Sequence, residues 1–274
     1  MIDEFLARDL SDVDEAVRKA AAVEIMPRFR QLADHEVDQK SGPHDLVTDA
    51  DRKAEEYLTA ALTRLLPGSA VVGEEAVHAD PEVYRALRAD APVWIVDPVD
   101  GTRQFVHGDP EFCTLVALAH RGEILASWTF APALEEMATA VRGRGAYVNG
   151  ERILSGSPEP GAELRVATAH PLYTTEEERR VLARLDVPGV SSRACGSAGL
   201  EYLKVARGEM DGLAFNWPSA WDHAAGLLLI AEAGGSQSTV DRVPFRVDRD
   251  NALPFAVGRD EATAIRIREL LRGE

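Results

Sequence analysis

The chain has 274 residues, 45% of them hydrophobic and 28% charged, which is the composition of a globular protein with one large or two small α/β domains. Its formal net charge of −16 argues against binding a polyanion such as nucleic acid through a broad basic surface. The two cysteines, Cys113 and Cys195, form no CxxC pair, which argues against a disulfide scaffold or a zinc site. No apolar run has the length of a signal peptide or a membrane span, so we expect a cytoplasmic protein free of the membrane.

The first half of the chain has the pattern of an α+β unit with a substantial sheet. Two amphipathic helices precede a series of short apolar strands, and the turn at Arg121-Gly122 indicates an antiparallel hairpin. The predicted helices run from Ser11 to about Leu32 and from about Asp51 to Leu65, and the predicted strands cover Ala70 to Val72, Val93 to Val96, Cys113 to Ala119, Ile124 to Phe130, Met137 to Val141 and Ala146 to Val148.

The second half alternates strand and helix, which is typical of an α/β unit. The Ser-, Pro- and Gly-rich loop from Ser155 to Gly161 is the predicted boundary, giving an N-terminal α+β subdomain (1–155) with a large antiparallel sheet and a C-terminal α/β subdomain (156–274). Predicted strands cover Leu164 to Ala169, Gly212 to Phe215 and Phe255 to Val257, and predicted helices cover Glu176 to Leu185, Ala198 to Arg207, Asp222 to Ala233 and Glu261 to Leu271.

Four carboxylates stand at element ends where the backbone can bring them together. Glu74 and Asp97 each follow a short apolar strand, Asp100 comes three residues later, and Asp222 stands at a helix start. If the two strands are neighbours in one sheet, their ends lie about 5 Å apart and the acids can share a metal cluster. Hard oxygen ligands of this kind favour magnesium, manganese or calcium over zinc.

The segment from Trp94 to Thr102, WIVDPVDGT, delivers two acids, a glycine and a hydroxyl within six residues after a buried strand. If a helical turn begins near Gly101, its free amides face an anion such as phosphate. A carboxylate pair beside an anion-binding helix start is an arrangement for phosphoryl transfer.

Taken together, these motifs resemble the inositol monophosphatase family, a superfamily of magnesium-dependent, lithium-sensitive phosphatases. The resemblance rests on DPVDGT, on Gly-Glu-Glu at 73–75, on Trp221-Asp222-x-Ala-x-Gly, on the upstream segment from Asp45 to Asp51 (DLVTDAD) and on Gly196-Ser197-Ala198. The matches follow the family's order and span residues 45 to 235. The implied fold is a five-layered αβαβα sandwich of the inositol monophosphatase and fructose-1,6-bisphosphatase type, assembled as a homodimer.

The resemblance also implies the site residues and the cofactor. Two or three Mg²⁺ ions are expected, with Mn²⁺ as a possible substitute, activating a water that attacks a small phosphomonoester. The implied metal ligands are Glu74, Asp97, the Val99 carbonyl, Asp100 and Asp222; the implied catalytic residues are Asp51, Thr102 and Glu74; and the implied substrate contacts are Asp100, Gly101, Thr102, Gly196, Ser197, Ala198 and Asp222.

The sequence leaves the substrate open. Inositol-specific members carry an acid upstream of the Trp-Asp motif, whereas this chain has Phe215-Asn216-Trp217-Pro218-Ser219-Ala220. Arg103 and Arg193 are either cations near the leaving group or ordinary surface ion pairs. Histidinol phosphate, a sugar or aminocyclitol phosphate and adenosine 3',5'-bisphosphate remain alternatives to inositol phosphate, and a non-catalytic metal-binding protein is the alternative of another class. His107 and His223 are interpreted as structural residues.

Overall fold

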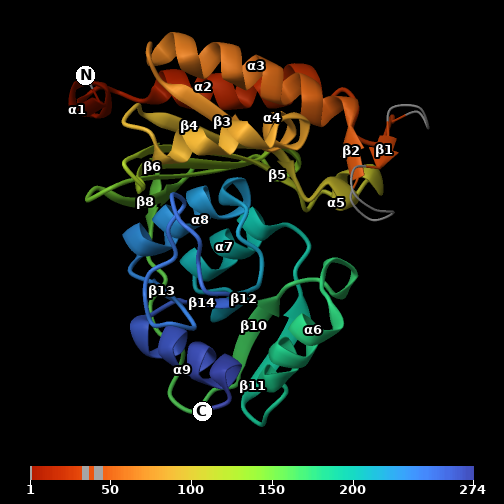
Figure 1. Cartoon of the computed structure of the whole chain (residues 1–274), viewed down its shortest axis with the longest axis vertical. Coiled ribbons are helices and arrows are strands. Elements are labelled where there is room, and N and C mark those ends of the chain that lie inside the picture. Colours follow the sequence, from red (N-terminus) through yellow and green to blue (C-terminus); the bar gives the residue numbers. More distant parts are fainter. Residues whose placement is uncertain (1, 33–36, 40–45) are drawn as a thin grey trace.

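The computed structural model describes residues 2–32, 37–39 and 46–274. Residues 40–45, which include Asp45, the first residue of the upstream motif, lie outside the described residues. Within the described part, helices and sheets alternate in five layers, and Figure 1 shows them from top to bottom.

The outer helical layer consists of α2 (Ser11–Ala20) and α3 (Asp49–Leu65), with the short α1 (Ile2–Ala7) beside them. The N-terminus of α3 is closed by a capping box in which Thr48 accepts from the backbone and Asp51 accepts from the Thr48 amide. The strands β1 (Val37–Gln39) and β2 (Leu46–Thr48) form a separate antiparallel pair just before α3.

The helix predicted to run from Ser11 to about Leu32 is shorter than expected. After Ala20 the chain continues as one π-helical segment, Ala21–Ile25, in which the Met26 amide donates to the Ala21 carbonyl at 2.8 Å, and turns follow. The physical reason is Pro27, because proline lacks an N–H and its ring collides with the carbonyl four residues earlier.

A seven-stranded sheet forms the second layer, in the order β3-β4-β5-β6-β7-β8-β9. The first pair is parallel and the remaining neighbours are antiparallel, so the expected antiparallel sheet carries one parallel edge strand. Short helical segments interrupt the strand series at α4 (Glu74–Ala79), the 3₁₀ helix Pro81–Arg88, α5 (Thr102–Val106) and the 3₁₀ turn Pro132–Leu134. The strands are β3 (Ala70–Gly73), β4 (Val93–Asp100), β5 (Cys113–His120), β6 (Glu123–Ala131), β7 (Glu136–Val141), β8 (Gly145–Val148) and β9 (Glu151–Ile153).

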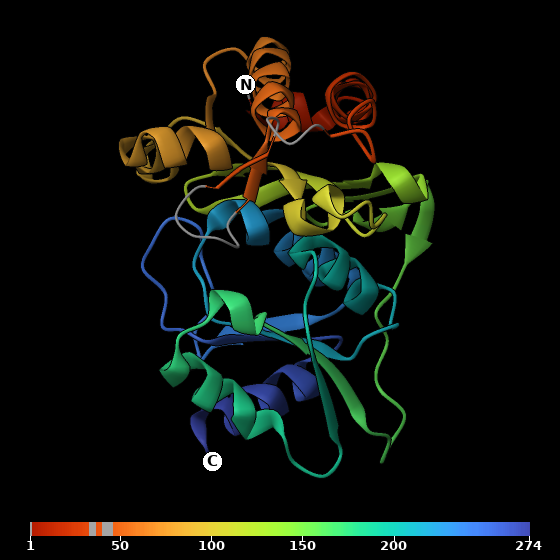
Figure 2. The same cartoon turned by 90° about the vertical axis from the view of Figure 1, so that its right-hand side faces the viewer.

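Helices α7 (Ala198–Ala206) and α8 (Ala220–Ala233) form the middle layer between the two sheets, as both views show (Figures 1 and 2). Nearly every residue of α7 and most residues of α8 are buried, which is expected of helices covered on two faces. Gly226 of α8 lies against the Tyr202 ring of α7, and a Cβ at this position would stand 2.1 Å from that ring. A glycine is therefore needed for the close approach of the two helices.

The fourth layer is a five-stranded mixed sheet in the order β11-β10-β12-β14-β13, and α6 and α9 cover its far face. The 3₁₀ turns Pro171–Tyr173 and Ala183–Leu185 flank α6. The bounds are β10 (Leu164–Thr168), α6 (Glu176–Leu182), β11 (Val190–Ala194), β12 (Gly212–Phe215), β13 (Ser236–Thr239), β14 (Phe255–Gly258) and α9 (Glu261–Arg272).

One hydrophobic cluster joins both halves of the chain through the middle helices. It contains Ile95 and Leu115 of the large sheet, Leu228 of α8, and Phe215 and Phe255 of the smaller sheet. A second cluster lies between the large sheet and the outer helices, and a third lies between the small sheet and α6 and α9. The two sheets are thus held on opposite sides of α7 and α8 by shared apolar packing. No helix among the described residues is long and apolar enough to cross a membrane.

Candidate active site

Strand pairing brings the predicted acidic residues to one edge of the large sheet. β3 and β4 are parallel neighbours, with Gly73 opposite Val96, so Glu74 and Asp97 follow directly from paired residues. Asp100 lies at the end of β4 beyond a bulge in its pairing with β5. Asp222 lies in the first turn of α8, which begins two residues earlier than expected, at Ala220.

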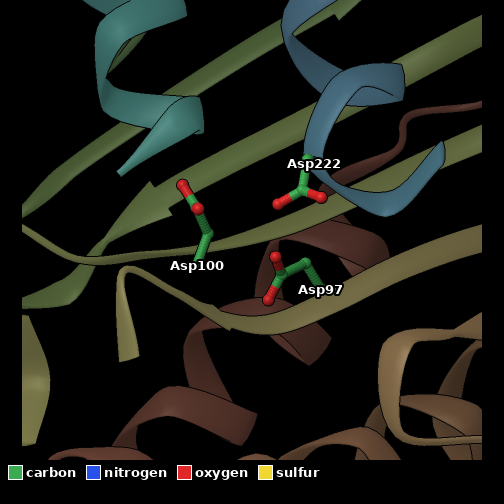
Figure 3. A group of neighbouring side chains, drawn as sticks. All are labelled: Asp97, Asp100 and Asp222. Carbon is green, nitrogen blue, oxygen red and sulfur yellow. The ribbon is translucent and has the colours of Figure 1, made fainter. Parts of the chain in front are cut away.

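Three of these carboxylates form a compact group. Asp97, Asp100 and Asp222 each place an oxygen within 4.8 Å of the others. The first two come from β4 and the third from the start of α8, and Figure 3 shows the three carboxyl groups beside one another. Asp97 is 2% exposed and Asp100 is 7% exposed, so two of the three acids are buried.

The electrostatics of the trio indicate what it can hold. Burial raises the pKa of Asp97 and of Asp222 well above the usual range, and neighbouring carboxylates raise both further. No lysine or arginine of the described residues forms an ion pair with any of the three. Grouped oxygen donors without a protein cation fit a hard divalent ion, which neutralises the repulsion between them.

Asp100 also joins β4 to the middle helical layer. Its Oδ2 accepts from the Ser197 hydroxyl at 2.5 Å and from the Gly199 amide at 2.7 Å, and its Oδ1 accepts from the Ala198 amide at 3.2 Å. These donors lie at the N-terminal end of α7, where unpaired amides favour a negative charge. The predicted Gly196-Ser197-Ala198 segment therefore contacts Asp100 and fixes its orientation.

Thr102 lies between Val99 and Asp51. Its hydroxyl lies 2.9 Å from the Val99 carbonyl and 3.3 Å from Asp51 Oδ1. A hydroxyl has one hydrogen, so it donates to one of these oxygens at a time, and the shorter distance favours Val99. Gly101 precedes it with φ of 88°, a conformation that glycine adopts without strain.

Asp51 is fully buried, and its environment differs from that of a surface capping residue. Its Oδ2 accepts from the Thr48 hydroxyl at 2.6 Å and from the Thr48 amide at 2.8 Å. Burial raises the pKa of Asp51 to about 7, and the charges of Glu74 and Glu75 add to the shift. Asp51 thus caps α3 with one oxygen and presents the other to Thr102.

A cavity of about 570 Å³ opens beside these residues. Glu74 lines it although it lies outside the compact trio. Asp51 and Ser197 do not line it, and they lie behind Thr102 and Asp100 respectively. The predicted site residues in its wall are Glu74, Asp97, Val99, Asp100, Gly101, Thr102, Gly196, Ala198 and Asp222.

Comparison with known proteins identifies the family to which the chain belongs. The inositol monophosphatase family model matches residues 7–264. The chain belongs to the inositol monophosphatase family. Among curated relatives, the inositol-1-monophosphatase of Mesorhizobium japonicum is 39% identical over 207 residues, covering 73% of this chain and 74% of the relative. That of Rhizobium meliloti is 39% identical over 201 residues, covering 71% and 72%.

A solved structure confirms the predicted five-layered fold. The extragenic suppressor protein suhB from Bartonella henselae matches with a TM-score of 0.82 at 28% identity, covering 96% of this chain and 98% of that one. As an inositol monophosphatase-family protein, the chain is a hydrolase of phosphomonoesters, and the family's dependence on metal agrees with the acidic trio. Its substrates are small phosphorylated compounds.

Glu55 is a site residue of this family member that the sequence analysis missed. Its carboxylate, 5% exposed, accepts from the amides of Glu75 and Ala76, both at 2.8 Å. It thereby closes the N-terminus of α4 and holds the backbone that carries Glu74. Gly73 leaves the necessary space, since a Cβ there would stand 2.2 Å from the Glu55 carboxyl carbon. A helical acid facing amides twenty residues later in the chain has no local sequence signal.

Replacing Glu55 by glutamine is expected to lower the free energy of unfolding by about 1–2 kcal/mol, because the amide group offers one acceptor oxygen where two amides now donate. Urea unfolding of the metal-free protein measures the change. A variant of equal stability would contradict the capping role. Glu56→Gln, on the exposed face of the same helix, is the matched control and should leave the unfolding free energy unchanged.

The cavity wall also contains aromatic and basic residues, and of the two arginines weighed in the sequence analysis it includes one. Trp217 and Trp221 line it, and the Trp217 indole donates to Asp222 at 3.0 Å. Arg103 and His170 line it as well, with Arg103 Nη1 3.4 Å from His170 Nε2. Arg193, the other basic candidate, instead forms an ion pair with Glu201 at 2.7 Å and does not line the cavity.

His223 is buried as a structural residue, in agreement with its interpretation from the sequence. Its Nε2 lies 2.9 Å from the Trp217 carbonyl and its Nδ1 lies 3.2 Å from the Tyr202 hydroxyl. The ring therefore donates through Nε2 and accepts through Nδ1. Burial lowers the pKa of His223 to about 3. Exposed His107 lies with its Nδ1 2.7 Å from the Arg103 carbonyl and does not line the cavity.

A pH titration followed by NMR of the ring nitrogens is expected to show His223 neutral from pH 8 to pH 5. In the unfolded chain it binds a proton near pH 6.5, so between 6.5 and 3 the unfolded state holds more protons than the folded one. The free energy of unfolding therefore decreases as the pH falls below 6.5, and His223 accounts for about 1.4 kcal/mol of this decrease per pH unit. Protonation of the folded ring near pH 6.5 would contradict this assignment.

Proposed function

We propose that the chain hydrolyses a small phosphomonoester with two or three Mg²⁺ ions bound by Glu74, Asp97, the Val99 carbonyl, Asp100 and Asp222. The observation that carries the proposal is the compact trio of carboxylates, two of them buried, in the wall of a large cavity, without a lysine or arginine paired to it in the described part of the chain. Mn²⁺ is a plausible substitute because it accepts the same oxygen donors.

Bound at these oxygens, Mg²⁺ supplies a Lewis acid that lowers the pKa of water and neutralises charge on the phosphate and the leaving oxygen. The residues of the chain provide the geometry. Asp100 is held by the start of α7, and Asp222 is held by the Trp217 indole, so both acids keep fixed orientations toward the cavity. Carboxylates held in this way do not have to change their orientation during the reaction.

Asp51 and Thr102 orient the attacking water. When the Thr102 hydroxyl donates to Asp51 in place of the Val99 carbonyl, its oxygen is able to accept a hydrogen bond from the water. The water oxygen forms a bond to phosphorus while the bond from phosphorus to the ester oxygen breaks. The attacking water gives up one proton and the leaving alkoxide takes up one, so that the products are the alcohol and inorganic phosphate. No covalent phosphoenzyme is required.

The Gly101 and Thr102 backbone contributes to binding the phosphate. α5 begins at Thr102, directly after the left-handed Gly101, so its first amides have no partner within the helix. They are able to donate to equatorial phosphate oxygens beside Asp100 and Asp222. Gly196 and Ala198 line the same part of the wall, and Ser197 supports it through Asp100.

The substrate is proposed from the relatives and from the departures of this chain. Inositol 1-phosphate follows from the names of the relatives. The segment upstream of Trp221 lacks the acid that grips sugar hydroxyls in inositol-specific members. Trp217 and Trp221 in the cavity wall favour a leaving group with an apolar or planar part, which keeps histidinol phosphate and adenosine 3',5'-bisphosphate as alternatives. Four further expectations from the sequence remain predictions: the division into two subdomains, the homodimer, the cytoplasmic location and inhibition by lithium.

The test is phosphate release from inositol 1-phosphate, histidinol phosphate, fructose 1,6-bisphosphate and adenosine 3',5'-bisphosphate, each with and without Mg²⁺. We expect release from at least one compound, abolished by a chelator and restored by added Mg²⁺. Equal release with a chelator present would contradict the metal proposal. No release from any compound by the folded, magnesium-loaded protein would favour the non-catalytic alternative.

A further inference from the structure

Arg103 is an unusual residue for this cavity. Among the described residues that line it, Arg103 is the sole lysine or arginine, whereas Glu74, Asp97, Asp100 and Asp222 supply negative charge. No carboxylate of residues 2–32, 37–39 and 46–274 lies within ion-pair distance of its guanidinium. In a chain of net charge −16, a partly buried arginine without a paired acid is a cation available to an anion from outside.

The contact between Arg103 and His170 adds a second donor at the same place. The Leu172 amide donates to His170 Nδ1 at 3.2 Å, so the neutral ring carries its hydrogen on Nε2. That nitrogen lies 3.4 Å from Arg103 Nη1, which is also a donor. The Arg103 guanidinium and the His170 ring thus lie together in the cavity wall, where both are able to contact one anionic group.

This pair is separate from the carboxylate trio. Arg103 belongs to α5, and His170 follows β10 of the smaller sheet, so the pair joins the two halves of the chain across the cavity. Arg103 lies more than 4.0 Å from the carboxylate oxygens of Asp97, Asp100 and Asp222, since it forms no ion pair with them. The guanidinium therefore does not pair with the proposed metal ligands, and its donors face the cavity wall beside them.

The cavity has room for that other group. Its volume of about 570 Å³ is far larger than one phosphate and falls in the range of about 300–1,000 Å³ found for pockets that take drug-sized ligands. Trp217 and Trp221 offer apolar wall for the body of the leaving group.

We propose that the leaving group of the substrate carries a second anionic group, a phosphate or a carboxylate, which binds Arg103 and His170 while the reacting phosphate lies at the trio. This inference rests on the proposed hydrolysis and names the class of its substrate. Arg103 is then a specificity-determining residue, since a substrate without the second anion leaves its donors unpaired.

The test compares kcat/KM for matched substrates that differ in the second anion. Adenosine 3',5'-bisphosphate against adenosine 3'-phosphate tests a second phosphate, and 3-phosphoglycerate against glycerol 3-phosphate tests a carboxylate. In at least one pair, the wild-type protein is expected to prefer the member with the second anionic group by about tenfold or more in kcat/KM. Arg103→Gln should lower that ratio towards one. Arg103→Lys, which keeps the charge and loses the planar fork, should restore part of the ratio.

Arg193→Gln is the matched control, because it removes one positive charge from the chain at a residue paired with Glu201 outside the cavity wall, and it should leave the ratio unchanged. A ratio near one in the wild type for both pairs overturns the inference. The inference is also overturned if Arg103→Gln lowers kcat/KM by the same factor for both members of a pair, since Arg103 would then bind the reacting phosphate. Release from no compound overturns the proposed hydrolysis, and with it this inference.

Discussion

Asp97→Asn is expected to lower kcat/KM for phosphate release by at least about a thousandfold at ordinary magnesium while the protein stays folded. Asp97 is buried within β4, and it is one of three carboxylates that each place an oxygen within 4.8 Å of the others. Removing its charge removes a ligand from the centre of the proposed metal site. Asp222→Asn removes a second ligand and should have a similar effect.

The stability of the same variant gives an independent readout. Burial and the charges of Glu74 and Asp100 raise the pKa of Asp97, so the ionised group costs free energy in the metal-free fold. Metal-free Asp97→Asn should therefore unfold at or above the temperature of the metal-free wild type. Added Mg²⁺ should raise the unfolding temperature of the wild type and have little effect on the variant. Near-normal turnover by a well-folded Asp97→Asn protein would refute the ligand assignment.

Thr102→Val should reduce kcat by about a hundredfold or more, with a smaller change in KM, because the hydroxyl is proposed to orient the water in the transition state. Valine has the shape of threonine and lacks the hydrogen bonds to the Val99 carbonyl and Asp51. Steady-state kinetics measures the effect.

Thr102→Ser is the matched variant, since it keeps the hydroxyl and should retain most of the activity. Urea unfolding checks that the valine variant loses only about 1 kcal/mol, the value of one lost hydrogen bond. If the valine variant turned over at more than half the wild-type rate, Thr102 would be a structural residue that caps the turn after β4, and the water would be oriented by other groups.

The acids at the strand ends could be predicted because their position follows from local pattern. Short apolar strands ending in Glu74 and Asp97 indicate a common sheet edge once the strands pair, and the structure pairs them in parallel. Asp100, three residues after Asp97, and Asp222, at a helix start, were also singled out by position, and both lie beside Asp97. Residues that are positioned by the end of a strand or the start of a helix can thus be predicted from the sequence.

Contacts between distant segments were not accessible in the same way. The hydrogen bonds from Ser197 and Gly199 to Asp100 span nearly one hundred residues, and those from the α4 amides to Glu55 depend on how α3 lies against β3. Arg103 could not be told from a surface residue, because its pairing with His170 depends on the approach of the two sheets. Local pattern specifies which elements form, whereas packing decides which side chains share a cavity.

Anomalous diffraction from crystals soaked in Mn²⁺ tests the metal centre most directly, because it locates the ion without relying on activity. We expect a strong peak within coordinating distance, about 2.0–2.4 Å, of carboxylate oxygens of Asp97, Asp100 and Asp222. The same experiment on Asp97→Asn should show a weaker peak or none. A wild-type protein with no peak at these three residues, or with its strongest peak elsewhere, would contradict the account.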